Sequence, residues 1–260
     1  MEKQVNPIED LMQRTTKRYL NGAAKRYSKR VPKIAAALRS LNKQSSVSLD
    51  NQQNKQIDFA SLFARFSELK FIKASIGKVW ESTWLLTGSE TFNSIYSTIG
   101  RQRPLDFIFL DRPMSDRMID KMAKEIQSTT EKNVRRIVTQ GIKEGIGRDA
   151  IASNIKLATA FSEMRSRRIA QTETTRSINA ATNQSYVRIE EQENITILKE
   201  WISSRDGLVR PTHEELDSMS PIPVKNDFTV DGFSAPSPAS FGEPEMDINC
   251  RCTIAPVVFT

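Results

Sequence analysis

The side chains in this sequence that could bind a metal ion lie near its C-terminus. The chain has one histidine, His213, and two cysteines, Cys250 and Cys252, separated by one residue. Residues two apart on a β-strand point to the same side, so both thiols could face His213. Asp206 or Asp217 could supply a fourth ligand and complete a tetrahedral zinc set. The C-x-C spacing differs from the usual C-x-x-C, and two small buried thiols beside a hydrogen-bonded histidine explain the same residues without metal. Zinc and a metal-free core therefore both stay open.

The same region raises the question of catalysis. Asp206, Arg210 and His213 could act together as an acid/base and phosphate-binding set, as in a nuclease or toxin-like enzyme. The sequence offers no second histidine, no glycine-rich phosphate loop and no D-x-D pair of carboxylates near them. We therefore predict that the chain is not an enzyme. Arg210 is instead expected to be architectural, bridging Asp206 or the region of Asp247.

An unusually polar segment, residues 168–179, precedes these residues and reads RIAQTETTRSIN. Arg168, Thr172 and Arg176 are four residues apart and would share one face of a helix. Glu173 is one turn from Arg176 and could pair with it. Such a helix is either exposed and rich in ion pairs, or packed through buried polar contacts against the C-terminal module.

Two further blocks follow this segment in the chain. The first has the spacing W-x4-D-x3-R-x2-H and contains Trp201, Asp206, Arg210 and His213. The second, Asn249-Cys250-Arg251-Cys252, stands just before a strand-like C-terminal segment.

In order and spacing the three blocks resemble the phage head morphogenesis family, the minor head proteins typified by protein F of phage Mu. The resemblance covers residues 165–256, and the predicted helix from Ser115 fits the same domain. It implies a virion protein of the inner head or portal vertex, present in the host cytoplasm during assembly. Its implied partners are the portal protein, the major capsid protein and packaged double-stranded DNA, whose delivery some members influence. The structural motif residues that the resemblance implies are Arg168, Glu173, Arg176, Asn179, Trp201, Asp206, Arg210, His213, Asn249, Cys250, Arg251 and Cys252.

Charge is distributed unevenly along the chain, whose formal net charge is +7. Residues 1–43 contain eleven Lys and Arg against three Asp and Glu, a net +8, whereas the last sixty-one residues contain four against ten, a net −6. A basic helix of this kind could neutralise DNA phosphates or dock on an acidic portal surface, or it could be a solvated helix face. The candidate contact residues are Arg14, Lys17, Arg18, Lys25, Arg26, Lys29, Arg30 and Lys33.

Apolar spacing and turn residues predict the secondary structure. Polar residues 42–57 read as a linker, and the proline-rich residues 218–248 as a long irregular loop. Helices are predicted over 8–43, 58–88, from Ser115 to about Gly145, and over 162–193, with a short helix after Asp149 that carries Ile151 and Ile155. Short strands are predicted over 195–202, 228–230 and 253–259, and residues 105–110 are either a short strand or a buried extended segment.

These elements predict an α+β protein, with mainly helical N-terminal and middle regions and a small C-terminal α+β module of short strands. The predicted domains are a basic helical arm and linker (1–57), a helical region (58–112) and a Mu F-like domain (113–260). No segment approaches the roughly 18 apolar residues of a spanning helix, and no secretory signal is expected, so no membrane partner is predicted.

Overall fold

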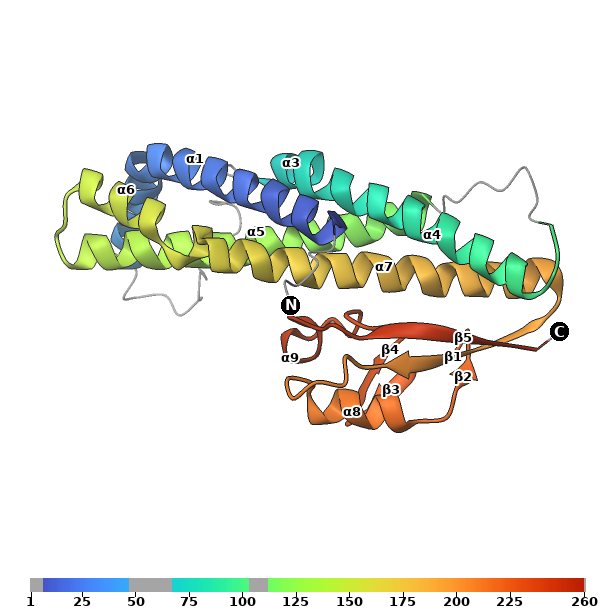
Figure 1. The fold of residues 1–260 in the computed structure, drawn as a ribbon. Helices are drawn as coiled ribbons and strands as arrows, with labels where there is room; N and C mark the ends of the chain where they lie inside the picture. The colour runs from blue at the N-terminus through green and yellow to red at the C-terminus, as the bar shows by residue number, and fades with distance from the viewer. Residues whose placement is uncertain (1–6, 47–66, 103–111, 260) are drawn as a thin grey trace. The chain divides into compact units, whose positions relative to one another are not determined.

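The computed structural model describes residues 7–46, 67–102 and 112–259. Helices dominate the first two-thirds of the chain and short antiparallel strands its C-terminal end (Figure 1), so the predicted α+β class is confirmed. The helical elements are α1 (Pro7–Ser46), α3 (Leu69–Ile72), a π-helical turn (Lys73–Gly77), α4 (Lys78–Thr98), α5 (Arg112–Lys143), α6 (Arg148–Leu157), a 3-10 turn (Thr159–Phe161), α7 (Glu163–Glu193), α8 (Pro211–Ser218) and α9 (Pro244–Asp247).

The described helices follow the predicted apolar pattern with a few differences. α1 continues to Ser46, so its last turn occupies the start of the predicted linker 42–57. Leu11, an apolar residue of α1, is 45% exposed. The rest of that linker, the first part of the predicted helix at 58–66 and the predicted strand or extended segment at 105–110 lie outside the described residues.

Two compact units make up the chain, and each combines segments that are distant in sequence. One unit comprises residues 1–13, 78–119 and 167–260, and the other comprises 14–77 and 120–166. The predicted domain boundaries near residues 57 and 112 stay predictions. Among the described residues, no helix is both long enough and apolar enough to cross a bilayer.

A buried carboxylate joins three elements of the unit formed by residues 14–77 and 120–166. Glu68, directly before α3, is fully buried. Arg26 of α1 donates through Nε to both Glu68 oxygens, at 3.0 and 2.8 Å, and Arg30 donates through Nη1 at 2.9 Å. The backbone N–H of Glu68 donates to Gln127 Oε1 of α5 at 2.8 Å. A buried charge needs such partners, because removing it from water costs several kcal/mol.

A second acidic side chain of this unit lies close to the first. Glu131 of α5 has one oxygen, Oε1, that is buried without a hydrogen-bond partner among the described residues. Burial raises the pKa of the Glu131 carboxyl to about 7, a hydrogen bond with Gln127 works against this, and the nearby charge of Glu68 adds to it. Glu131 is therefore expected to be protonated in part near neutral pH.

The C-terminal module belongs to the other unit and contains a small antiparallel sheet. Its strand order is β2-β1-β5, with Trp201 of β1 opposite Ile254 of β5, and β3 and β4 form a separate hairpin. Trp201 lies in an apolar core with Phe228 of the hairpin and Ile189 of α7. The strands are β1 (Thr196–Ile202), β2 (Ile222–Pro223), β3 (Phe228–Val230), β4 (Phe233–Ala235) and β5 (Thr253–Phe259).

The raised pKa of Glu131 predicts a pH-dependent stability. Between its ordinary pKa of 4.5 and about 7 the folded protein binds more protons than the unfolded chain, so stability falls as the pH rises through this window. Glu131→Gln should match the wild type near pH 5 and exceed it by roughly 1–2 kcal/mol near pH 8, after allowance for solvent screening. Thermal unfolding at both pH values measures this. Glu125→Gln, an exposed site on the same helix, is the matched control, and an equal pH response of the two variants would contradict the assignment.

Candidate functional site: the polar core of the C-terminal module

The polar segment of α7 is buried. Thr172, Glu173, Arg176 and Asn179 all have less than a tenth of their surface exposed, whereas Arg168, one turn before Thr172, is exposed. Of the two interpretations open from sequence, buried polar packing is therefore the one that the structure shows. Each buried polar group then needs a partner, because an unsatisfied one costs about 1–3 kcal/mol.

Arg176 lies at the centre of this polar core. Its Nη1 donates to Glu173 Oε1 at 2.9 Å, and its Nη2 is 3.5 Å from Asp247 Oδ2. Its Nε donates to the carbonyl of Ala239 at 2.7 Å. The guanidinium thus binds one acidic residue of its own helix, one acidic residue of α9 and the backbone of the proline-rich loop.

Asp247 extends the same network into the loop. Its oxygens accept the backbone N–H groups of Phe241 at 3.0 Å and Gly242 at 2.8 Å. Ala239 and Gly242 both have positive φ, at 62° and 85°, a conformation that an L-residue such as alanine rarely adopts without outside contacts. The contacts of Arg176 and Asp247 with this stretch supply them.

α7 also binds the backbone of the Asn249–Cys252 block. Thr175 Oγ1 donates to the Cys250 carbonyl at 2.9 Å, and Asn179 Nδ2 donates to the Cys252 carbonyl at 3.0 Å. The backbone N–H of Asn249 donates to the hydroxyl of Thr172 at 3.1 Å. Three side chains on one helix face therefore fix the path of this block just before β5.

The loop between β1 and α8 contributes two surface ion pairs. Arg251 contacts both oxygens of Asp206, with Nη2 at 2.7 Å from Oδ1, and this contact, followed by the backbone N–H of Leu208, lowers the pKa of Asp206 to about 2. Arg205 binds Asp217 through two bonds of 3.0 Å and likewise lowers its pKa to about 2. Both carboxylates are thus already engaged by arginines.

Arg210 has the architectural position predicted for it. Its Nη2 donates to the carbonyl of Ile248, the neighbour of Asp247, while Asp206 binds Arg251 instead. Of the two bridging partners considered from sequence, the structure therefore shows the region of Asp247.

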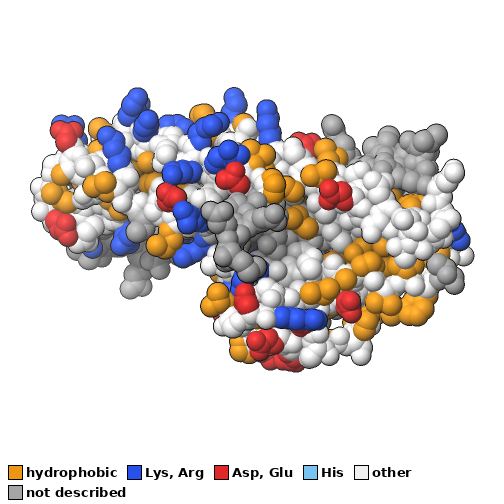
Figure 2. Space-filling model, in the orientation of Figure 1, with side chains coloured by type: hydrophobic (Ala, Val, Ile, Leu, Met, Phe, Trp, Pro, Cys, Tyr) orange, Lys and Arg blue, Asp and Glu red, His pale blue; other side chains and the backbone are white. Residues whose placement is uncertain are grey.

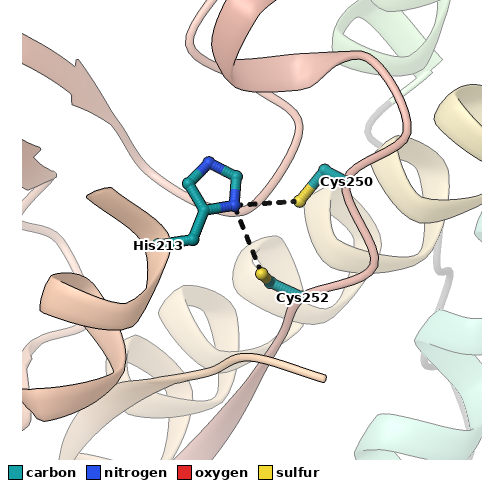
Figure 3. Close-up of side chains that lie close together, drawn as sticks. All are labelled: His213, Cys250 and Cys252. Atoms are coloured by element: carbon teal, nitrogen blue, oxygen red, sulfur yellow. Dashed lines mark hydrogen bonds between the residues drawn. The ribbon is translucent and has the colours of Figure 1, made fainter. Parts of the chain in front are cut away.

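His213, Cys250 and Cys252 come together in the interior of the module (Figure 3). His213 Nδ1 is 3.4 Å from Cys252 Sγ and 3.8 Å from Cys250 Sγ. The Cys250 thiol and then His213 lower the pKa of Cys252 to about 5, although burial opposes this, whereas the same contact and burial raise the pKa of Cys250. Neither Asp206 nor Asp217 belongs to this cluster.

The nuclease-like set does not converge on an open site in the described residues. A surface depression is lined by Asp206 and Asp217 among others, but His213 is not in its lining. His213 is almost fully buried, with its ring against those of Trp201 and Phe241. The three residues thus have separate partners in different places.

Lys199 is a buried polar residue that the sequence reasoning missed. It is fully buried on β1, and its Nζ donates to Asn183 Oδ1 at 2.8 Å and to the Pro236 carbonyl at 2.7 Å. Burial lowers the pKa of its ammonium to about 8. The period-two pattern contained the signal, because Lys199 stands between Ile197 and Trp201 on the inward side of the strand.

The predicted basic residues of α1 fall into two groups. Arg26 and Arg30 are half-buried against Glu68, whereas the other six are exposed, and Lys17 pairs with Glu163 at 3.0 Å. Figure 2 shows Lys and Arg side chains gathered on the surface in the region of α1. The exposed members are Arg14, Lys17, Arg18, Lys25, Lys29 and Lys33.

The described site is an α+β module in which Arg176, Asn179 and Arg210 bind backbone carbonyls of the C-terminal segments. Residues 132–255 match the family described as "Phage Mu protein F like protein". This match, over just under half of the chain, confirms the predicted resemblance to the Mu F-like phage head morphogenesis family.

A curated relative and the solved structures add further comparisons. The chain is 33% identical over 149 residues to a protein of Enterococcus faecalis named NAD(+)--arginine ADP-ribosyltransferase EFV. The match covers 57% of this chain and 30% of that protein, so the chain spans less than a third of its relative's length. No solved structure matches.

Removing Arg176 tests whether the polar core depends on it. Arg176→Ala leaves Glu173 and Asp247 buried without their cation, a loss that typically costs about 3–5 kcal/mol. The exposed Arg168→Ala on the same helix should change stability by no more than about 0.5 kcal/mol. Urea unfolding of both variants gives the comparison, and similar midpoints for the two would argue against a central role of Arg176.

Proposed function

We propose that the chain is a minor head protein of a tailed phage, recruited to the portal or inner head during procapsid assembly. The single observation that carries the proposal is the Mu F-like match over residues 132–255. The geometry agrees with it, because the buried polar contacts of α7 build a module and leave no convergent catalytic set among the described motif residues. Its proposed role is assembly without catalysis, with the portal protein or the major capsid protein as partner.

The exposed basic face of α1 supports a second part of the proposal, contact with packaged DNA that aids its packaging or delivery. Arg18, Lys25 and Lys29 are seven and four residues apart, which places them along one face of a helix, and all three are exposed. Lys and Arg that neutralise phosphates release counterions, so such binding needs no base-reading motif. The acidic surface of a portal protein would be recognised by the same charges.

The name of the enterococcal relative raises transfer of ADP-ribose to arginine as a second candidate function. This chain matches 30% of that protein, and the name describes the whole of it. The shared part is therefore as compatible with an assembly module as with an enzyme domain. The buried position of His213 also speaks against the alternative of a nuclease or toxin-like enzyme centred on that residue.

Quantitative mass spectrometry of purified virions and DNA-free proheads tests the assembly role. A minor head protein recruited during assembly should be present in both, in few copies relative to the major capsid protein. Its presence in proheads should not depend on DNA. If the protein is absent from both particles and remains free in the cell lysate, the assembly role is wrong and the enzymatic and DNA-binding alternatives come first.

Salt-dependent DNA retention tests the basic face. The triple variant Arg18→Ala, Lys25→Ala and Lys29→Ala should lower the slope of log affinity against log salt by roughly 3, about one for each phosphate that the protein no longer neutralises. The matched control removes three exposed lysines of α5, Lys121, Lys124 and Lys132, and should keep the wild-type slope. Equal slopes for the two variants would contradict a specific role of this face of α1 in DNA binding.

A further inference from the structure

The ligand atoms of His213, Cys250 and Cys252 are spaced as zinc requires. Zn–S bonds of about 2.3 Å and Zn–N bonds of about 2.0 Å at tetrahedral angles place sulfur and nitrogen about 3.5 Å apart. The two sulfur–nitrogen distances here are 3.4 and 3.8 Å. All three ligand atoms lie within 4.8 Å of one another, and two zinc-bound sulfurs are about 3.8 Å apart, so the cluster has the size that a zinc ion needs.

The surrounding structure fixes these three side chains in place. Thr175 and Asn179 bind the carbonyls of the two cysteines, and His213 lies in the first turn of α8, which begins at Pro211. The ring of His213 is turned so that Nδ1 faces both thiols, whereas Nε2 is buried and has no hydrogen-bond partner among the described residues. Metal sites depend on this kind of outer support for ligand orientation.

We propose that His213, Cys250 and Cys252 bind one Zn²⁺ ion through Nδ1 and two thiolates. The two negative thiolates balance the charge of the ion, so the buried site is neutral as a whole. Thiolate and imidazole are the ligands that select zinc over the oxygen-seeking Mg²⁺ and Ca²⁺. Asp206 and Asp217 are bound by arginines, so the fourth position belongs to a ligand from outside this set, such as water.

The ion would act as a cross-link within the module. It joins α8 to the segment before β5, which closes a long loop that includes the proline-rich stretch. Cross-links that close long loops stabilise the folded state most, because they remove the most freedom from the unfolded chain. This role concerns the stability of the module and does not depend on its place in a virion.

The first experiment measures metal in the untagged full-length protein purified from zinc-supplemented cells. Mass spectrometry for metals should give one zinc per chain, and the two thiols should react with a thiol reagent only after chelator removes the zinc. Chelation should lower the melting temperature by several degrees, and Zn²⁺ but not Mg²⁺ should restore it. Because this uses the wild type, the test does not depend on a variant that folds.

Variants identify the ligands. Cys250→Ser and Cys252→Ser should lose the zinc, and cobalt-exchanged wild type should show a thiolate charge-transfer band that each variant loses. Asp206→Asn is the matched control and should keep the zinc, because its carboxylate pairs with Arg251. Wild type that carries no zinc and takes none up, a disulfide between the cysteines, or loss of zinc in Asp206→Asn would each overturn the proposed ligand set.

Discussion

The buried guanidinium of Arg176 is the constraint on which the C-terminal module depends. A charge inside a protein must be matched by opposite charge and hydrogen bonds, since its desolvation otherwise costs several kcal/mol. Here the partners are Glu173 on the same helix, Asp247 on α9 and the carbonyl of Ala239. The loop that ends in α9 must therefore return to α7 for the charge of Arg176 to be satisfied. Asp247 in turn binds two backbone amides of the loop, so one ion pair determines the path of a segment that has little regular structure.

A helix that packs through polar groups specifies its register more strictly than an apolar one. Apolar side chains tolerate small shifts, whereas a donor moved by one residue leaves both itself and its acceptor unsatisfied. Thr175 and Asn179 donate to carbonyls two residues apart in the Asn249–Cys252 block, and this match fails if either segment slips. The apolar core around Trp201, which includes Ile189 of α7, supplies burial, and the polar contacts select one arrangement.

Local spacing predicted the elements of this fold but only part of its long-range pairing. The helical pattern of α7 and the alternation of β1 could be read from the sequence, and so could the pairing of Glu173 with Arg176, because these depend on neighbours within one turn. The partner of Asp206 could not be predicted from the sequence, since Arg251 is 45 positions away and only the folded chain brings the two together. The same reason explains why Asp206 was considered as a metal ligand. A carboxylate can bind a metal ion only if the fold has not already paired it with a cationic side chain, and spacing along the sequence does not reveal that pairing.

Counting the basic residues of α1 in the sequence overstates the positive charge that its surface offers to a partner. Residues 1–43 have a net charge of +8, yet Arg26 and Arg30 are directed at Glu68 and serve the folded state. These two arginines have a role in folding whether or not the protein meets DNA. The positions left for an external polyanion are the exposed ones, such as Arg18, Lys25 and Lys29, which lie along one face of the helix. If α1 contacts DNA, the number of phosphates neutralised is therefore set by its exposed Lys and Arg side chains and not by its total charge. The same number sets the salt dependence of binding.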